Sequence, residues 1–422
     1  MSVDILLGLQ WGDEGKGKII DYLSPKYDII ARFQGGPNAG HTLVIGGQKT
    51  VLHTVPSGIM QERPMNVIGN GVIINPITLK EEIEDLQTKG IQIKGKLLVS
   101  RKAHFILPTH IFLDKADEEA KGGDKIGSTG RGIGPTYVDK IGRKGLRVGY
   151  AEGNDFKDRY QMLADVHKTI LSQRYPNYEY SLADIEQQWF EAIEYLLSLE
   201  ILMDTEYYIN HALSQGQTVL AEGAQGTMLD IDFGTYRYVT SSNTIAGGAC
   251  TGLGIGPNKI KEVIGIAKAY CTRVGSGPFP SELDNEVGEQ IRQIGNEFGA
   301  TTGRPRRTGW IDVPQLQYAV MVNGVTQIAL TKSDVLNSFE EIQVCNAYTV
   351  NGKTLWHLPS DLCTTTIEPQ WLTHKGWKSD LISGEKLPEN FDTYVKFLEG
   401  RLKTPITLIS TGPEREKLIV RN

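Results

Sequence analysis

The stretch from Gly12 to Lys18, Gly-Asp-Glu-Gly-Lys-Gly-Lys, has the residue types and spacing of a phosphate-binding loop. It fits the pattern G-x-x-x-x-G-K, in which glycines let backbone N–H groups point at phosphate oxygens and the following helix presents its positive end. The next residue is Ile19, where the usual pattern has a Ser or Thr whose hydroxyl binds Mg²⁺. Asp13 offers a hard carboxylate oxygen inside the loop, so we expect it to replace that hydroxyl. The alternative is a plain glycine-rich turn.

A second motif, Thr331-Lys332-Ser333-Asp334, resembles the guanine-reading pattern N-K-x-D with Thr in place of Asn. A carboxylate accepts hydrogen bonds from both N1–H and N2–H of guanine, whereas adenine offers no such pair, and a lysine stem covers the face of the base. Alone the motif is weak, because an ordinary turn after a strand has the same residues. Together with the phosphate loop it favours a guanine nucleotide. The segment Ser410-Thr411-Gly412-Pro413 follows another expected strand and is a further candidate for the base pocket.

Arg304, Arg306 and Arg307 form the densest cationic cluster of the chain. An anionic ligand would relieve their mutual repulsion, and guanidinium groups match carboxylates and phosphates in a two-pronged geometry. Solvation at the surface is the alternative.

His41 lies in a second glycine-rich loop, which starts at Gly35. Its imidazole titrates near neutrality, so it is a candidate general acid or phosphate donor. For the remaining histidines we expect structural roles: His53, His104, His110, His167, His211, His357 and His374.

The elements that must position these residues can be read from the apolar pattern. Strands are expected near 3–9, 28–33, 97–99, 217–222, 263–273, 326–331 and 405–410, and helices near 19–23, 76–87, 108–121 and 285–298. Gly46-Gly47 predicts a hairpin between 42–45 and 49–53. Residues 122–149 are expected to form a long glycine-rich basic loop, and residues 155–215 a helical insertion. The pattern predicts an α/β fold with a large, mostly parallel central sheet, flanking helices, and ligands along its carboxyl edge.

The composition excludes several classes of protein. Forty-four basic and 50 acidic residues give a formal charge of −6, which argues against broad binding of nucleic acid or of an anionic membrane. The sequence has no uninterrupted run of 18 apolar residues, so we expect no membrane span. The first residues lack a secretory signal, so we expect a cytoplasmic protein. The four cysteines are widely spaced, so buried free thiols are expected. We expect residues 1–422 to form a single domain.

Several runs closely resemble the adenylosuccinate synthetase family, in the order that the family has them. They are Leu9 to Lys18, Gln34 to Thr42, Gly130 to Pro135, Glu222 to Gly226, Thr240 to Asn243, Thr301 to Trp310 and the loops of the C-terminal strands. The resemblance implies a P-loop NTPase-like fold and a homodimeric ligase of AMP biosynthesis. Such an enzyme joins IMP and L-aspartate to adenylosuccinate through a 6-phosphoryl-IMP intermediate, converts GTP to GDP and phosphate, and holds one Mg²⁺ per subunit.

The resemblance also implies roles for single residues. Asp13 would be the base that removes the N1 proton of IMP, His41 the acid that supports the leaving GDP, and Arg143 would reach IMP from the partner subunit. Asp13 and the carbonyl of Gly40 would bind Mg²⁺. The implied GTP site comprises Gly12, Asp13, Glu14, Gly15, Lys16, Gly17, Lys18, Gly40, His41, Thr42, Arg306, Lys332, Ser333, Asp334, Ser410, Thr411 and Gly412. The implied IMP site comprises Asp13, Glu14, Gly15, Lys16, Asn38, Ala39, Gly40, His41, Thr129, Arg143, Gln225, Thr240 and Arg304. The implied aspartate site comprises Thr301, Thr302, Gly303, Arg304, Pro305 and Arg306.

Two other classes of function share part of this pattern. A regulatory P-loop GTPase would have the phosphate loop and the guanine motif, but it needs neither the basic loop 301–307 nor the glycine-rich segment 122–149. A P-loop kinase that acts on a small acid would use ATP. Ser333 stands where the family has leucine, but both charged residues of the guanine motif remain.

Overall fold

The structure is a computed structural model that describes residues 2–45, 47–299, 303–381 and 386–421. Thr301 and Thr302, which we expected in the aspartate site, lie outside these residues. The strands are β1 (Ser2–Gly8), β2 (Ile29–Arg32), β3 (His41–Ile45), β4 (Gln48–Leu52), β5 (Met65–Ile68), β6 (Ile73–Ile74), β7 (Leu97–Ser100), β8 (His104–Phe105), β9 (Leu202–Met203), β10 (Thr218–Glu222), β11 (Ile260–Lys268), β12 (Tyr270–Arg273), β13 (Arg307–Asp312), β14 (Gln327–Thr331), β15 (Glu341–Val350), β16 (Lys353–Leu355), β17 (Glu368–Lys375), β18 (Ile406–Ser410) and β19 (Leu418–Val420). The α-helices are α1 (Lys16–Leu23), α2 (Pro76–Thr88), α3 (Pro108–Ala120), α4 (Ile133–Ile141), α5 (Phe156–Arg174), α6 (Ala183–Ser198), α7 (Thr205–Ser214), α8 (Gly247–Leu253), α9 (Glu286–Ile294), α10 (Val313–Asn323) and α11 (Glu389–Leu402).

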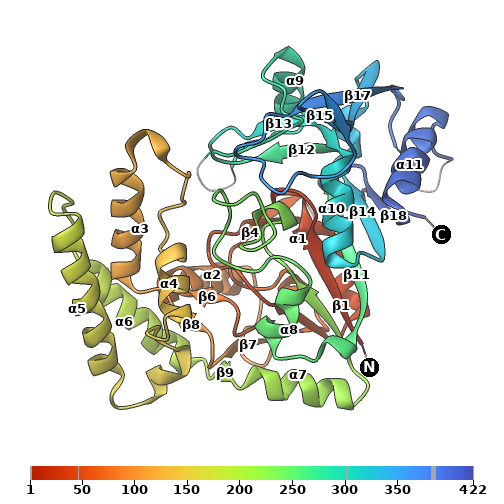
Figure 1. Cartoon of the computed structure of the whole chain (residues 1–422). Coiled ribbons are helices and arrows are strands. Elements are labelled where there is room, and N and C mark those ends of the chain that lie inside the picture. Colours follow the sequence, from red (N-terminus) through yellow and green to blue (C-terminus); the bar gives the residue numbers. More distant parts are fainter. Residues whose placement is uncertain (1, 46, 300–302, 382–385, 422) are drawn as a thin grey trace.

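A ten-stranded sheet forms the centre of the molecule, in the order β19-β18-β14-β11-β1-β10-β2-β5-β7-β9. All neighbours in it are parallel except the edge pair of β18 and β19. The expected mostly parallel sheet is therefore confirmed. β1 lies in the middle (Figure 1), and the strands on both sides of it end at the same edge, where polar loops follow.

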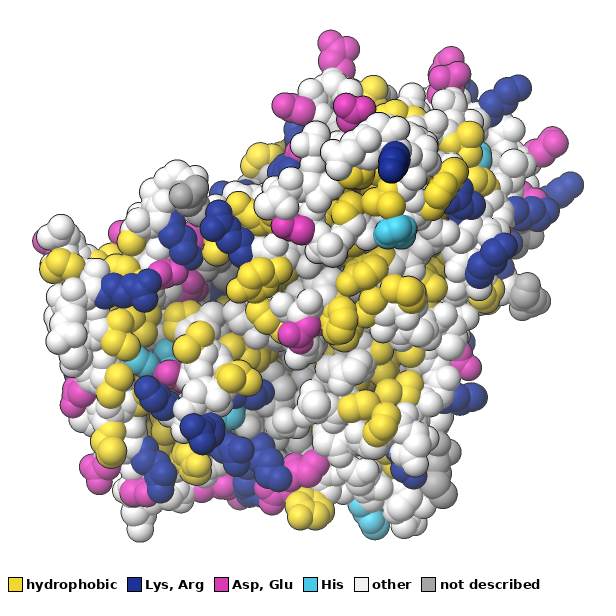
Figure 2. Space-filling view, viewed as in Figure 1, with side chains coloured by type: hydrophobic (Ala, Val, Ile, Leu, Met, Phe, Trp, Pro, Cys, Tyr) yellow, Lys and Arg dark blue, Asp and Glu magenta, His cyan; other side chains and the backbone are white. Residues whose placement is uncertain are grey.

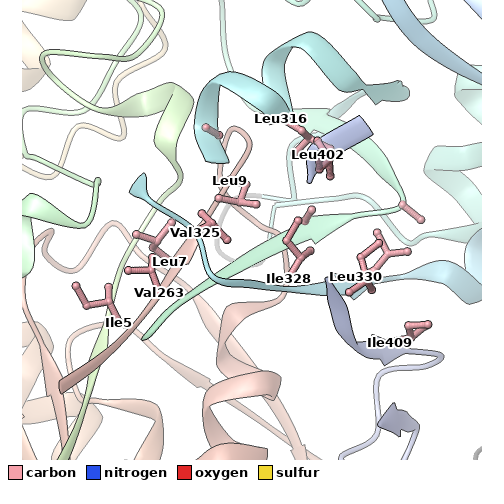
Figure 3. Close-up of a cluster of buried hydrophobic side chains, with 14 of the residues drawn as sticks. Ile5, Leu7, Leu9, Val263, Leu316, Val325, Ile328, Leu330, Leu402 and Ile409 are labelled. Carbon is pink, nitrogen blue, oxygen red and sulfur yellow. The ribbon is translucent and has the colours of Figure 1, made fainter. Parts of the chain in front are cut away.

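The two faces of the sheet are covered by different helices. Val3, Ile5 and Leu7 of β1 belong to a buried cluster that includes residues of α7, α8, α10 and α11. Figure 3 shows part of this cluster, with Ile5, Leu7 and Leu9 close to β11 and β14. Leu6 points to the other face and belongs to a cluster with residues of α1. The alternation along β1 places helices on both sides, as expected for a parallel sheet.

A second sheet and a hairpin flank the centre. β12, β13, β15 and β16 follow one another in the second sheet, and β17 pairs with β15. The expected strand 263–273 is in fact two strands, because β11 ends in the central sheet at Lys268 and Tyr270 opens β12 in the second. The hairpin of β3 and β4 is confirmed.

Two expected segments differ from the structure. The loop predicted for residues 122–149 contains α4, which starts after the left-handed Gly132 and packs Ile133 and Tyr137 against Ile73 and Ile106. The sequence did not predict this helix, because it has few apolar residues and lies in a segment rich in glycine. The segment 155–215 contains α5, α6 and α7 but also β9, which pairs with β7 at the edge of the central sheet.

The surface and the cysteines complete the description. Cys271 and Cys345 are buried and Cys250 is partly buried, but Cys363 is exposed, contrary to expectation; all are free thiols. Figure 2 shows Lys and Arg side chains mixed with Asp and Glu over one face. Within the described ranges, none of the helices is long and apolar enough to cross a membrane.

Candidate active site

The phosphate loop joins β1 to α1 at the carboxyl edge of the central sheet, as predicted. Gly15 has a φ of 84° and directly precedes α1, so the loop turns into the helix through a left-handed residue. Gly17 lies so close to the hairpin that a Cβ on it would be 3.0 Å from the Cβ of His41. The hydroxyl of Thr331, at the end of β14, donates to the carbonyl of Glu14 at 2.6 Å. These contacts bring the loops of β1, β3 and β14 together.

Glu14 shapes the phosphate loop from inside. Its buried carboxylate accepts from the backbone N–H groups of Gln10 (3.1 Å) and Gly12 (2.9 Å) and from the ammonium of Lys16 (2.8 Å). Lys16 also donates to the carbonyl of Gln225. The Glu14 carboxylate therefore holds the shape of the loop through contacts within the chain.

Lys18 ties the phosphate loop to the C-terminal strand. Its ammonium lies 2.8 Å from Ser410 Oγ, 2.7 Å from the Gly412 carbonyl and 2.7 Å from the Lys417 carbonyl. Burial lowers the pKa of Lys18 to about 8, although Asp334 nearby opposes this. The segment 410–412, assigned to the base pocket, therefore lies directly beside the helix that follows the phosphate loop.

Asp13 is paired with an arginine of the basic loop. It takes a left-handed φ of 59°, and its Oδ2 accepts from Arg306 Nε at 2.7 Å. A second nitrogen of Arg306 donates to Glu297 at 2.6 Å. The structure thus joins the phosphate loop to the arginine cluster, although the two lie almost 300 positions apart in the sequence.

Glu297 is a functional candidate that sequence reasoning missed. It is fully buried, and its Oε1 accepts from Lys268 at 2.9 Å and lies 3.2 Å from the ammonium of Lys332. Burial alone would raise the pKa of Glu297, but Lys268, Lys332 and Arg306 outweigh burial and hold it well below its usual range. It follows the end of α9 by three residues, and no motif in the sequence around it could have revealed it.

The expectation that Arg304, Arg306 and Arg307 repel one another until an anion binds is wrong for two of them. Arg306 is paired as described, and Arg307 Nε donates to Glu282 at 2.6 Å. The chain supplies carboxylates to both. Arg304 is exposed, as are Gly303 and Pro305.

His41 and Glu222 form a buried pair between β3 and β10. Nδ1 of His41 lies 2.5 Å from Glu222 Oε1, and Ser57 donates to both carboxylate oxygens, from its hydroxyl and its backbone N–H, at 2.8 Å each. Burial lowers the pKa of His41, whereas its bond to Glu222 opposes this. Because a carboxylate accepts at Nδ1, Nε2 is the nitrogen left to face a ligand. Sequence reasoning placed Glu222 in a family motif but gave it no role.

Two buried amide side chains point to a ligand. Gln225 Nε2 and Asn38 Oδ1 are buried and have no hydrogen-bond partner among the described residues, and Gln225 has a left-handed φ of 56°. Gln34 donates to Gln225 Oε1 at 3.1 Å, which fixes the direction of the amide. Buried polar groups are normally satisfied, so these atoms mark where a polar ligand is expected. Both residues belong to the predicted IMP site.

The guanine motif lies at the end of β14. Lys332 takes a left-handed φ of 56° and donates to the carbonyl of Gly295 at 2.6 Å. Burial raises the pKa of Asp334, so a ligand with paired N–H donors would satisfy a carboxylate that is costly to keep charged. The Ser333 hydroxyl is buried and finds no hydrogen-bond partner in the part of the chain that the structure describes.

The other predicted residues differ in how far they are buried. Thr129 is exposed, and Thr240 is partly buried with its N–H donating to Leu229 at 2.8 Å. Arg143 is exposed just after α4. Within the described part of the chain its side chain has no hydrogen-bond or ion-pair partner. Gly40 and Thr42 are partly buried, and Ala39 is buried, beside His41.

Comparison with known proteins gives one consistent result. A family model described as "Adenylosuccinate synthetase" matches residues 5–419. The chain is 56% identical to the adenylosuccinate synthetase of Christiangramia forsetii and 55% identical to that of Flavobacterium johnsoniae, over 100% of each chain. The structure resembles the fully ligated adenylosuccinate synthetase from Plasmodium falciparum, with a TM-score of 0.93, 40% identity and complete coverage of both chains. A cyanophage S-2L succinoaminodeoxyadenylate synthetase, at 21% identity and a TM-score of 0.64, shares the fold.

Proposed function

The chain belongs to the adenylosuccinate synthetase family, and we propose that the loops around Asp13 and His41 carry out the reaction of that family. The enzyme is a ligase of AMP biosynthesis with a P-loop NTPase-like fold. It joins IMP and L-aspartate to adenylosuccinate, with GTP as co-substrate and Mg²⁺ as cofactor. Nothing supports a regulatory GTPase. The observation that carries the assignment of the site is that Asp13, on the phosphate loop, is bound to Arg306 of the basic loop at 2.7 Å.

The proposed first step is phosphoryl transfer. Asp13 takes the N1 proton of IMP, so that O6 becomes the nucleophile and attacks the γ-phosphorus of GTP. The bond from that phosphorus to the β,γ-bridging oxygen breaks, and GDP leaves. Nε2 of His41 donates a hydrogen bond to the phosphate region, where negative charge develops. Glu222 supports this role, because its carboxylate favours the protonated imidazole.

The proposed second step is substitution at C6 of the purine. The amine of aspartate attacks C6 of 6-phosphoryl-IMP, the C6–O bond breaks, and phosphate leaves with the electron pair and takes up the proton that the amine gives up. Arg304 and Arg306 would hold the aspartate carboxylates, because guanidinium groups bind carboxylates in two-pronged geometry. Arg306 must then exchange a carboxylate of its own chain for one of the substrate.

The proposed metal site fits the donor preference of Mg²⁺. The Asp13 side chain is 36% exposed at the mouth of the phosphate loop, and the peptide carbonyl of Gly40 lies just before β3. Both are hard oxygen donors. When bound there, Mg²⁺ supplies charge neutralisation to the phosphates of GTP.

The remaining contacts follow from position. We assign IMP to the phosphate-loop residues Asp13 to Lys16, the segment 38–41 and Gln225, with Thr129, Thr240 and Arg304 around them. We assign GTP to the loop 12–18, to segment 40–42, to Arg306 and to the guanine pocket of residues 332–334 and 410–412. Aspartate is assigned to the basic loop 301–306.

The assembly and location also belong to the proposal. A homodimer is consistent with the family. The exposed Arg143 would complete the IMP site of the partner subunit. We further propose a single domain, because the central sheet takes strands from residue 2 to residue 420, and a cytoplasmic location.

The test separates the two steps. With GTP carrying ¹⁸O in the β,γ-bridge, IMP and Mg²⁺ but no aspartate should let the label scramble into non-bridging β positions, because phosphoryl transfer is reversible. Asp13→Asn should abolish both scrambling and turnover while leaving a folded dimer; above about a hundredth of the wild-type rate, Asp13 is not the base. ATP in place of GTP should not react.

A further inference from the structure

A buried cluster of two histidines and an aspartate joins three helices below the turn that carries Arg143. His110 lies on α3, Asp139 on α4 and His167 on α5. Oδ2 of Asp139 lies 2.9 Å from His110 Nε2 and 2.8 Å from His167 Nε2. The side chains of the histidines are 0% and 3% exposed and that of the aspartate 14%. None of these residues enters the proposed reaction steps.

The hydrogen bonds show that the cluster connects the three helices and is not a metal site; we call it the brace. The ligand atoms lie within 4.8 Å of one another, which is the spacing of a metal site. However, the backbone N–H of Leu107 donates to His110 Nδ1 at 3.0 Å. A backbone N–H only donates, so Nδ1 carries no proton and Nε2 carries the proton of the neutral ring. A metal on Nε2 would require a ring that has lost both protons. His110 Nε2–H therefore donates to Asp139, and burial, which lowers the pKa of His110 to about 4, agrees with a neutral ring.

The backbone of Asp139 holds the turn that follows α4. Its carbonyl accepts from the N–H groups of Lys144 at 2.9 Å and Gly145 at 3.0 Å, and the N–H of Arg143 donates to Lys140 at 3.2 Å. Arg143 itself has a left-handed φ of 62°. Such a conformation is unfavourable for a residue with a Cβ, and it persists only where the surroundings impose it.

Asp139 thus connects the turn that carries Arg143 to the helices α3 and α5. The carboxylate of Asp139 binds α3 and α5, and its carbonyl closes the turn. In Figure 1, α4 lies beside α3, with α5 at the outer edge of the molecule. Since the last turn of a helix frays unless it is held, loss of the carboxylate contacts would release the end of α4 and change the direction of Arg143.

We propose that His110 and His167 act through Asp139 as positioning residues, which set the Arg143 turn so that its guanidinium reaches the IMP site of the partner subunit. This inference rests on the proposed role of Arg143 in that site. It goes beyond that role because it names the groups that orient the arginine, all of them in the subunit that donates it and not in the subunit whose site is completed.

The first test is steady-state kinetics of Asp139→Ala in the full-length dimer. The KM for IMP should rise by about tenfold, the order of one misplaced charge-assisted hydrogen bond, while the KM for GTP stays within about twofold of the wild type. Asp139→Asn keeps an oxygen that accepts from both histidines and should restore the KM for IMP to within about threefold of the wild type. Equal defects in the two variants would overturn the proposal.

A matched control removes a different hydrogen bond between α3 and the end of α5. Asp117 on α3 accepts from the hydroxyl of Tyr175, which caps α5, at 2.8 Å. Asp117→Ala therefore loosens the same pair of helices without touching α4. It should lower thermal stability but leave the KM for IMP unchanged. A rise in the KM for IMP equal to that of Asp139→Ala would show a general structural effect and would also overturn the proposal.

Subunit exchange separates this inference from the proposed role of Arg143. Asp139→Ala chains mixed with Asp13→Asn chains should recover about a quarter of the wild-type activity at low IMP, because random pairing makes half of the dimers mixed and each has one intact site of two. Arg143→Leu mixed with Asp13→Asn should recover the same. If only the Arg143→Leu mixture recovers, the brace is wrong; if neither recovers, Arg143 does not act across the interface.

Discussion

Replacing Glu222 by Gln is the sharpest test of how His41 is activated. In the structure the carboxylate accepts three hydrogen bonds, one from His41 at 2.5 Å and two from Ser57 at 2.8 Å. A glutamine has one oxygen and one NH2 group in the same space. If its oxygen faces His41, its NH2 meets the N–H of Ser57; if it is flipped, the NH2 meets the ring and forces the other tautomer. Either orientation leaves one pair of groups mismatched.

The magnitude follows from the lost carboxylate. A hydrogen bond to a charged group contributes about 1.5–3 kcal/mol, so we expect kcat to fall by about 10- to 100-fold. Glu222 opposes the fall in the pKa of His41 that burial causes. Its removal should therefore lower that pKa further, and the imidazolium should lose its proton at a lower pH. The alkaline limb of the kcat profile should move to lower pH by about one unit, equivalent to roughly 1.4 kcal/mol.

The assay is initial rates at saturating substrates across pH, with Glu82→Gln as the matched control. Glu82 is a second buried carboxylate near the buried Arg32: burial lowers the pKa of Arg32, and the charges of Glu222 and Glu82 both oppose this. Glu82 accepts from backbone N–H groups, and within the described residues it has no hydrogen bond with His41. Glu82→Gln should lower stability and leave the limb in place. The reasoning fails if Glu222→Gln keeps kcat within about threefold and the limb does not move.

Three further outcomes are expected. Arg306→Leu should raise the KM for aspartate by about 10- to 100-fold, because a charge-assisted contact to a carboxylate is lost; an unchanged KM at saturating IMP and GTP would remove this residue from the aspartate site. Asp334→Asn should lower kcat/KM for GTP by at least about 100-fold and make xanthosine triphosphate the better substrate, since an amide donates to the O2 of xanthine; retained preference for GTP would contradict the guanine pocket. Burial lowers the pKa of His110 to about 4 in the folded protein. As the pH falls from about 6.5 to 4, His110 therefore binds a proton in the unfolded chain but not in the folded protein. The free energy of unfolding should fall over that window by up to about 3 kcal/mol from this residue, and His110→Asn should make urea melts less dependent on pH there.

Much of the fold follows from local pattern, and the errors have a common cause. Continuous apolar runs such as 217–222 and 326–331 fit strands that are buried on both faces, and they lie in the sheet as predicted. The run 263–273 was divided between two sheets, because an apolar run says that a segment is buried and not which neighbour it joins. The helix α4 was missed because only a few of its positions, among them Ile133 and Tyr137, are buried, which leaves a weak period among glycines.

The site shows the same limit in its chemistry. The residues that we assign to ligands lie in glycine-rich runs or in short motifs with a recognisable spacing, and the phosphate loop, His41 and the guanine motif were identified from these. Glu297 and Glu222 contact these assigned residues from positions far away in the sequence. A single buried carboxylate leaves no spacing to detect, since its partners are chosen by the three-dimensional packing.

The arginine cluster shows why charge density in a sequence does not by itself locate a ligand. Arg307 satisfies its charge with Glu282, whereas Arg306 is held by Glu297 and by Asp13, the residue we assign as the base. In the proposed reaction, a carboxylate of aspartate takes the place of one of these two carboxylates on Arg306. The arginine that we assign to the aspartate site therefore contacts the residue that we assign as the base, and this contact between the loops of β1 and β13 joins two segments that no spacing in the sequence relates.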